Sequence, residues 1–235
     1  KKTLQYTFKC SIMERSEVIM KKVVAMIMAS GTSRRMKGVN KLLIEIQGES
    51  VIRKSVKLFQ VDWVDEILVV TTDPLIREEV QDIGVSFCDG GVERYHSVIN
   101  GLDRLEDEDV VLIHDGARPF LDAKTLERVK EAVLKEDHFV VGVPAIDTIK
   151  VVENGLVKET PERKNLYYAQ TPQGSTVKVL KEAYEKALEK GLKLTDDASA
   201  LEALGIPVKM IEGSYQNKKI TTREDVDHYE NRSRN

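Results

Sequence analysis

The sequence is poor in cysteine, proline and aromatic residues. Its 235 residues include two cysteines, six prolines and 6% aromatic side chains. Cys10 and Cys88 cannot build a disulfide framework or a four-ligand zinc site, so we expect a reducing, cytoplasmic setting. A chain that is 41% hydrophobic with 14 glycines is ordinary for a globular protein, which excludes a disordered or collagen-like protein.

Long hydrophobic runs and an excess of basic residues are also lacking. No apolar run approaches the roughly 18 residues of a membrane span. The 36 basic and 39 acidic residues leave a net charge of −3. We therefore expect no membrane and no nucleic-acid partner. Glu14, Arg15 and Glu17 interrupt the apolar core that a secretory signal needs, so residues 1–22 are expected to be a poorly ordered N-terminal extension.

Several familiar catalytic motifs do not occur. The loop after Gly31 lacks the Gly-Lys-Ser/Thr ending of a P-loop, and Ser33 stands where a dinucleotide fingerprint needs its second glycine. The four histidines are scattered and form no metal-ligand pair, and there is no Gly-x-Ser-x-Gly elbow. A P-loop NTPase, a dehydrogenase, a structural zinc protein and the commonest kind of hydrolase are therefore not supported.

From Val23 onward, short apolar runs alternate with amphipathic stretches, which is typical of a parallel sheet with crossover helices. No repeat or linker divides the chain, so a single α/β domain over residues 23–235 is expected. The expected strands are 23–28, 67–70, 85–88, 110–113, 140–143 and 208–211. The expected helices are 51–59, 74–82, a helix through residues 98–105, 126–134, 177–188, 198–204 and one opened by the capping-box pattern Thr221-Thr222-Arg223-Glu224.

One segment departs from this alternation. Thr148–Val152 and Leu156–Thr160 flank Asn154-Gly155, a strong signal for a two-residue hairpin turn. We expect a hairpin arm that protrudes from the main sheet over residues 147–172, approximately.

Four polar clusters stand at predicted strand ends or loops, at residues 30–41, 90–97, 115–118 and 217–221. Loops on a rigid sheet concentrate binding groups, so these clusters suggest one shared site. Gly31 allows backbone N–H groups to approach an anion, and Arg34, Arg35 and Lys41 add positive charge. This loop is either a triphosphate cradle or a plain turn with a solvated basic face.

Asp115 stands at the end of a buried strand, close to Arg118. A carboxylate there can bind magnesium (Mg2+), which proteins usually hold through one or two carboxylates and substrate phosphates. The alternative is that Asp115 caps a turn or pairs with Arg118 in the scaffold.

Seven motifs stand in a fixed order along the chain. They are Ala29-Ser30-Gly31-Thr32-Ser33-Arg34-Arg35-Met36, Gly90-Gly91-Val92-Glu93-Arg94 with Ser97-Val98, His114-Asp115-Gly116-Ala117-Arg118-Pro119, Asp147-Thr148-Ile149-Lys150, Gln170-Thr171-Pro172-Gln173, Thr195-Asp196-Asp197-Ala198-Ser199 and Asn217-Lys218-Lys219-Ile220-Thr221. With these motifs, residues 23–229 resemble the 2-C-methyl-D-erythritol 4-phosphate cytidylyltransferase family.

This resemblance implies a Rossmann-like, mostly parallel sheet with helices on both faces. It also implies cytidylyl transfer from CTP to a sugar-alcohol phosphate, with release of pyrophosphate. Arg35, Lys41 and Lys219 would be catalytic and Asp115 would hold Mg2+. The resemblance assigns nucleotide binding to Ala29, Ser30, Gly31, Thr32, Ser33, Arg34, Gly91, Ser97, Gly116 and Ala117.

The resemblance further implies that Arg163, Thr171 and Thr195 bind the acceptor, methylerythritol phosphate. Arg163 and Thr171 would come from the hairpin arm of a partner subunit, which makes the expected enzyme a homodimer with shared sites. Taken without the resemblance, Arg163 is better interpreted as a surface charge, and Thr195-Asp196-Asp197 as a helix cap with acidic first-turn residues.

The sequence departs from the family pattern at several positions. The basic loop is one residue shorter before Lys41, Asn40 replaces a proline and Ser33 a glycine. Val92 stands where an acidic residue is frequent, Lys218 replaces an apolar residue and Gly116 an alanine. Two alternatives stay open: a cytidylyltransferase for ribitol 5-phosphate or another polyol phosphate, and a non-catalytic CTP-binding module.

Overall fold

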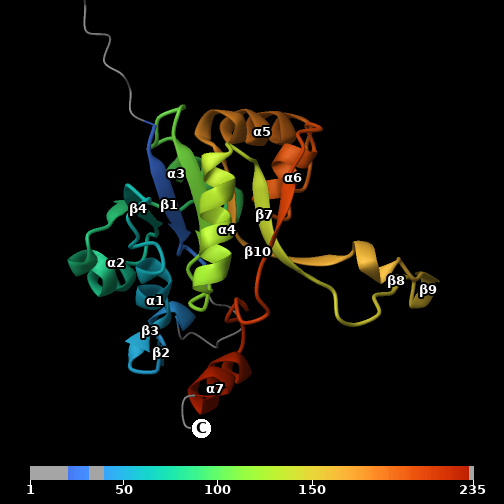
Figure 1. Cartoon of the computed structure of the whole chain (residues 1–235), viewed down its shortest axis with the longest axis horizontal. Helices are drawn as coiled ribbons and strands as arrows, with labels where there is room; N and C mark the ends of the chain where they lie inside the picture. Colours follow the sequence, from blue (N-terminus) through green and yellow to red (C-terminus); the bar gives the residue numbers. More distant parts are fainter. Residues whose placement is uncertain (1–20, 32–39, 233–235) are drawn as a thin grey trace, which may run out of the picture.

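A seven-stranded sheet forms the centre of the computed structural model, which describes residues 21–31 and 40–232 (Figure 1). Every strand except β10 runs in the same direction, so the predicted mostly parallel sheet is confirmed. In spatial order the strands are β11 (Lys209–Glu212), β7 (Phe139–Pro144), β10 (Tyr167–Thr176), β6 (Val110–Asp115), β1 (Val23–Met28), β4 (Glu66–Val70) and β5 (Ser86–Cys88).

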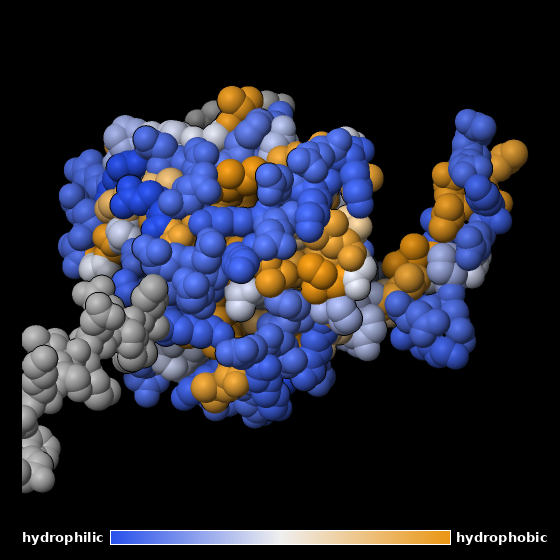
Figure 2. All heavy atoms as spheres, turned by 90° about the horizontal axis from the view of Figure 1, so that it is seen from above, coloured by the Kyte–Doolittle hydropathy of each residue, from blue (hydrophilic) through white to orange (hydrophobic). Residues whose placement is uncertain are grey.

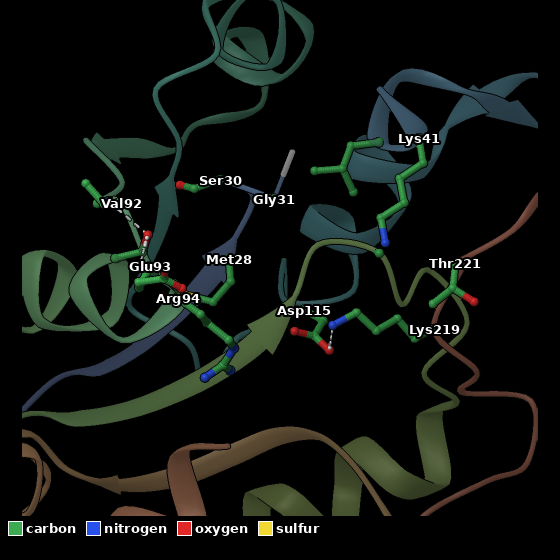
Figure 3. A pocket seen from close by; sticks show the side chains of 14 residues that line it. Met28, Ser30, Gly31, Lys41, Val92, Glu93, Arg94, Asp115, Lys219 and Thr221 are labelled. Carbon is green, nitrogen blue, oxygen red and sulfur yellow. Dashed lines mark hydrogen bonds and ion pairs between the residues drawn. The ribbon is translucent and has the colours of Figure 1, made fainter. Parts of the chain in front are cut away.

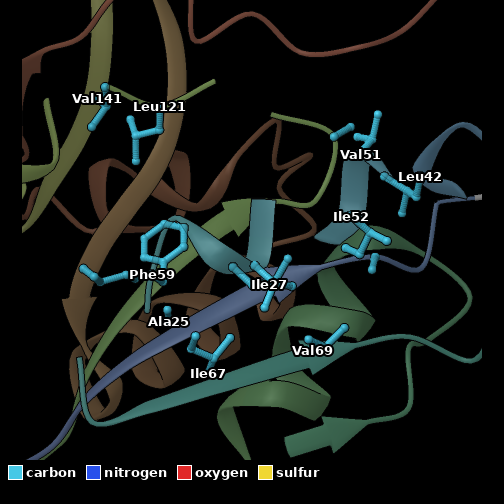
Figure 4. Packing of buried hydrophobic residues seen from close by; sticks show 14 of the residues in the cluster. Ala25, Ile27, Leu42, Val51, Ile52, Phe59, Ile67, Val69, Leu121 and Val141 are labelled. Atoms are coloured by element: carbon cyan, nitrogen blue, oxygen red, sulfur yellow. The ribbon is translucent and has the colours of Figure 1, made fainter. Parts of the chain in front are cut away.

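Helices cover both faces of this sheet. Side chains alternate along β1, so Ala25 and Ile27 join one core cluster whereas Val24 and Met26 join the other. The first cluster includes residues of α1 (Val51–Lys57), α2 (Pro74–Val80), α4 (Ala123–Leu134) and α7 (Arg223–Arg232), and Figure 4 shows part of it around Ile27 and Phe59. The second cluster includes residues of α3 (Arg94–Leu102), α5 (Val177–Glu189) and α6 (Asp197–Glu202).

Strand β10 was not predicted from the sequence. It lies antiparallel between β6 and β7, and all its residues from Gln170 to Ser175 are buried. The expected arm of residues 147–172 therefore ends too late, because Tyr167 and the residues after it belong to the central sheet. Pairing with strands that are distant in the sequence, rather than local alternation, creates this strand.

The arm itself is a short hairpin of β8 (Val151–Glu153) and β9 (Leu156–Glu159). Asn154 and Gly155 have φ angles of 50° and 79°, as a type I′ turn requires, so the hairpin prediction is confirmed. Every residue of both strands is exposed, including Leu156 at 75%. The arm stands clear of the body in Figure 1, and Figure 2 shows apolar residues along it.

Smaller elements complete the described chain. Lys41–Leu43 forms a 3-10 helix (η2) that precedes the hairpin of β2 (Glu45–Ile46) and β3 (Glu49–Ser50). Two further 3-10 helices are η3 (Gln81–Ile83) and η4 (Arg163–Asn165). Among the described helices, none combines the length and apolar character needed to span a bilayer. The expected N-terminal extension lies outside the described residues, except for Lys21 and Lys22.

Candidate active site

A cavity of about 480 Å³ opens at the carboxyl ends of β1 and β6. The chain passes from β1 outward to β4 and β5 and then returns through α3 to β6 on the other side of β1. Such a reversal of strand order separates the loops and leaves a crevice for a ligand. The cavity is lined by Met28, Ser30, Gly31, Lys41, Leu42, Gly91, Val92, Glu93, Arg94, Ser97, Asp115, Ala117, Lys219 and Thr221 (Figure 3).

The loop after β1 packs tightly against the end of β4 and the loop after β5. Ala29 is buried and its N–H donates to the carbonyl of Val70 at 2.9 Å, while the Ser30 hydroxyl donates to the same oxygen at 3.0 Å. A Cβ atom at Gly90 would lie 2.0 Å from Ser30 Oγ, so a glycine is required at this contact. The predicted residues Ser30 and Gly31 line the cavity, whereas Ala29 is buried next to them and does not line it.

Ser97 holds the second loop in shape. Its hydroxyl oxygen accepts a hydrogen bond from the N–H of Gly91 at 2.9 Å, and the side chain is buried. The next turn is closed by a capping box in which Glu93 N donates to His96 Nδ1 at 3.3 Å. Both predicted residues, Gly91 and Ser97, therefore lie at the cavity, with Ser97 fixing the backbone that surrounds it.

Asp115 ends β6 on the cavity floor and is surrounded by positive charge. Its Oδ2 atom lies 2.9 Å from Lys219 Nζ and 3.2 Å from Arg118 Nε. Burial by itself raises the pKa of Asp115, but the charges of Lys219, Arg118 and Arg94 outweigh burial and hold this pKa well below its usual range. The carboxylate is therefore ionised at neutral pH. Asp115 forms the pair with Arg118 that was the alternative to metal binding, and it also faces the cavity.

The loop that carries Lys219 is fixed to the strand-end loop after β6. Arg118 Nη1 donates to the carbonyl of Asn217 at 2.8 Å, and Ile220 N donates to the carbonyl of Ala117, also at 2.8 Å. Lys41 Nζ donates to the carbonyl of Ile220 at 2.8 Å. Two of the three predicted catalytic cations, Lys41 and Lys219, thus come together at one cavity although they are far apart in the sequence (Figure 3).

The far end of this loop is anchored on α7 by one carboxylate. Asp225 Oδ2 accepts hydrogen bonds from the backbone N–H and the hydroxyl of both Thr221 and Thr222, at 2.8 to 3.1 Å. Asp225 Oδ1 pairs with Lys218 Nζ at 2.7 Å. The predicted capping pattern is therefore wrong by one residue, because the acid at the third helical position, Asp225, is the one that reaches back rather than Glu224.

Gly116 and Ala117 connect Asp115 to this loop. Gly116 N donates to the carbonyl of Met28 at 3.0 Å, and a Cβ at this glycine would lie 2.9 Å from Ile52 Cδ1. Gly116, which replaces the alanine of the family pattern, thus leaves room for the close approach of Ile52 from α1. Ala117 lines the cavity, whereas Gly116 lies behind it.

The structure contradicts the prediction that the arm carries Thr171. This residue lies in β10, is 4% exposed and does not line the cavity. Its Oγ1 accepts a hydrogen bond from Asp115 N at 3.0 Å and lies 3.1 Å from His114 Nδ1. The hydroxyl is therefore engaged inside the protein, where it supports the backbone of Asp115 from the same chain.

The other two predicted acceptor-binding residues are exposed but do not line the cavity of their own chain. Arg163 lies at the base of the arm, where its Nη1 atom donates to the carbonyl of Ile146 at 2.9 Å. Thr195 directly precedes Asp196, the N-cap residue of α6, and its N–H donates to Ser199 Oγ at 3.2 Å. Asp196 caps α6 through Ser199, so the helix-cap interpretation of this motif is confirmed.

Four predicted phosphate-loop residues lie outside the described residues. They are Thr32, Ser33, Arg34 and Arg35. Their assignments stay predictions.

Sequence reasoning missed a charge pair at the edge of the cavity. Arg94 lines the cavity and forms a two-pronged ion pair with buried Asp197 of α6. Both residues stood within recognised motifs, but their 103-residue separation hid the contact. A lone arginine and a lone aspartate in sequence carry no signal that they pair.

Comparison with known proteins agrees with this geometry. The family model for 2-C-methyl-D-erythritol 4-phosphate cytidylyltransferase matches residues 23–231. The chain belongs to this family. It is 41% identical over 218 residues to the cytidylyltransferase of that name from Geotalea uraniireducens, covering 87% of this chain and 94% of the relative. It is 40% identical over 211 residues to the one from Geobacillus thermodenitrificans, covering 86% and 92% of the two chains.

Solved structures of the family share the fold. The crystal structure of 4-diphosphocytidyl-2C-methyl-D-erythritol synthase from Anaerococcus prevotii has a TM-score of 0.81 and 29% identity, and the match covers 92% of this chain and 97% of that one. The family enzyme from Thermus thermophilus has a TM-score of 0.74 at the same identity, with 89% and 98% covered. The Rossmann-like fold expected from the sequence is therefore confirmed for this family member.

Proposed function

We propose that this chain transfers a cytidylyl group from CTP to 2-C-methyl-D-erythritol 4-phosphate and releases pyrophosphate. Membership of the cytidylyltransferase family supports the proposal. The observation that carries it is the convergence of Lys41 and Lys219 beside ionised Asp115 in one cavity at the strand ends. This arrangement suits a reaction in which two polyanions must approach one another.

The chemistry needs charge neutralisation more than a general base. A phosphate monoester loses its second proton near pH 6, so at neutral pH it already carries an ionised nucleophilic oxygen. That oxygen forms a bond to the α-phosphorus of CTP while the bond from phosphorus to the bridging oxygen breaks. The bonding electron pair leaves with pyrophosphate. Fixed cations at the α-phosphate stabilise the charge that develops in this step, which is the role we assign to Lys41, Lys219 and Arg35.

Asp115 offers the cavity an ionised carboxylate as a protein ligand for magnesium. Within residues 21–31 and 40–232, no cluster of three or more His, Cys, Asp or Glu side chains could hold a metal ion. Asp115 is ionised and faces the cavity, so we propose that it holds Mg2+ together with phosphate oxygens of CTP. When bound there, the ion would neutralise phosphate charge. Lys219 Nζ lies 2.9 Å from Asp115 Oδ2, so this cation stands beside the position that we propose for the ion.

We propose that the enzyme is a homodimer and that the arm reaches the partner's cavity. The arm buries none of its own residues, and Val151, Val152, Leu156 and Val157 expose apolar surface. Apolar surface of this kind marks a protein interface. Arg163 lies at the base of the arm, so it would join the partner's acceptor site.

The free, buried thiol of Cys88 supports the cytoplasm as the setting that we propose.

A pyrophosphate-release assay with CTP and magnesium tests the function. We expect release with methylerythritol phosphate and much less with ribitol 5-phosphate. Faster turnover of ribitol 5-phosphate would favour the other cytidylyltransferase, and CTP binding without release of pyrophosphate with either acceptor would favour a binding module.

Mixing Arg163→Ala and Lys41→Ala chains should restore some activity in verified heterodimers, because one of the two shared sites would then be intact.

A further inference from the structure

One buried carboxylate joins three helices beside the cavity. Asp197 accepts hydrogen bonds from Arg94 Nη1 and Nη2 at 2.8 and 2.6 Å, and from the Tyr184 hydroxyl at 2.6 Å. Asp197 is 2% exposed and Tyr184 is 1% exposed. The Arg94 side chain faces the cavity and is 37% exposed, so Asp197 is the buried charge that needs compensation. These contacts therefore hold their three helices in a defined arrangement.

The carboxylate connects the two loops that the proposed reaction must align. Arg94 is the first residue of α3 and directly follows the Gly91 loop on the nucleotide side. Asp197 is the first residue of α6 and directly follows Thr195 and Asp196, on the side that we assign to the acceptor. Tyr184 lies in α5, within the second core cluster, and anchors the pair to the body.

Each loop is shaped by contacts that do not involve this carboxylate. On the nucleotide side, Gly91 N donates to Ser97 Oγ at 2.9 Å. On the acceptor side, Asp196 and Ser199 form a capping box, and Gln173 bonds to Asp196 Oδ2 at 2.9 Å and to Ala198 N at 2.7 Å. Loss of the Arg94–Asp197 pair would thus leave both loops folded but less restrained, and it would change the spacing between them.

We propose that Asp197 is a positioning residue that sets the distance between the nucleotide loop and the acceptor loop through Arg94 and Tyr184. The inference rests on the proposed function for its catalytic consequence. In-line attack needs the acceptor oxygen and the α-phosphorus at near-contact distance, and a misplacement of about 1 Å can lower the rate about 100-fold. Asp197 therefore acts on the transfer step and leaves the separate binding of each substrate nearly unchanged.

The test compares Asp197→Asn, Tyr184→Phe and Arg94→Lys with the unchanged chain. We expect Asp197→Asn to lower kcat about 10-fold or more, whereas the Kd for CTP and the KM for the acceptor change less than about 3-fold. Tyr184→Phe should have a smaller effect in the same direction. The double variant Asp197→Asn/Arg94→Lys should be no slower than the slower single variant, because the two residues act as one unit.

Asp109→Asn is a matched control for loss of stability. Asp109 is also buried, at 3% exposed, and accepts hydrogen bonds from Lys22 N and Glu106 N, but it lies at the opposite end of β6 from the cavity. It should lower the Tm and leave kcat unchanged below the unfolding transition. An equal loss of kcat in Asp109→Asn and Asp197→Asn would overturn the proposal, as would a rise in acceptor KM with no change in kcat.

Hydrogen exchange provides a readout that needs no substrate. Peptides that cover residues 90–96 and 192–199 should both exchange faster in Asp197→Asn than in Asp109→Asn. Unchanged exchange in either segment would overturn the link between the loops. If the unchanged chain released no pyrophosphate from CTP and methylerythritol phosphate, the proposed function would be wrong. The hydrogen-exchange result would still test whether Asp197 connects the nucleotide loop to the acceptor loop.

Discussion

Replacing Thr171 by valine removes the hydroxyl that joins Asp115 to His114 and nearly preserves the shape of the side chain. Burial lowers the pKa of His114 to about 4, so the ring is neutral at pH 7. The carbonyl of Arg118 lies 3.0 Å from His114 Nε2 and can only accept, so Nε2 carries the proton. The Thr171 hydroxyl therefore donates to Nδ1 and accepts from Asp115 N.

Valine would leave two buried polar groups without partners, namely the N–H of Asp115 and Nδ1 of His114. An unpaired buried group costs about 1–3 kcal/mol, so for two such groups we expect the free energy of unfolding to fall by about 2–6 kcal/mol. In a domain of this size each kcal/mol corresponds to about 2–4 °C in Tm. Urea denaturation and thermal melting of the two proteins measure this loss.

Thr171→Ser is the matched control, because it keeps the hydroxyl and removes one methyl group. It should retain most of the stability that valine loses. A valine variant as stable as the unchanged chain, but with a raised KM for the acceptor, would refute the reasoning. That outcome would mean that the hydroxyl binds substrate rather than the backbone of Asp115.

Three further predictions follow from the site and the arm. Lys219→Ala should lower kcat about 100-fold or more with a much smaller change in the Kd for CTP. Lys218→Ala, which removes an ion-pair partner of Asp225, should change kcat far less. An equal loss of kcat in the two variants would count against the catalytic role of Lys219. As pH falls from about 6.5 to 4, the free energy of unfolding should decrease by up to about 3 kcal/mol, because the unfolded chain binds a proton at His114 that the folded chain binds only near pH 4. This stabilisation is complete above pH 6.5, and denaturation of His114→Gln should show a flatter curve in that window. Leu156→Lys on the arm should convert the proposed dimer into monomers in sedimentation experiments, whereas Leu134→Lys, equally exposed at the end of α4, should not.

Local sequence patterns were enough for the parts of the fold that depend on neighbouring residues. Apolar runs such as 110–113 predict buried strands, and amphipathic stretches predict the helices that cover them. The Asn154-Gly155 turn needs left-handed backbone at two successive positions, a demand that these residue types reveal by themselves. Since parallel strands end at one edge, the sequence also predicted that Gly31, Gly91, Asp115 and Lys219 surround a single site.

The tertiary structure decided what depends on contacts between distant segments. β10 has a polar sequence with Pro172 and Gly174 in it, and only its pairing with β6 and β7 makes it a strand. The same pairing places Thr171 in the central sheet rather than on the arm, where its hydroxyl accepts a hydrogen bond from the backbone of Asp115. Arg94 and Asp197 are joined because α3 and α6 pack on the same face of the sheet. Periodicity is a local property of the chain, whereas the partner of a buried polar group is set by packing.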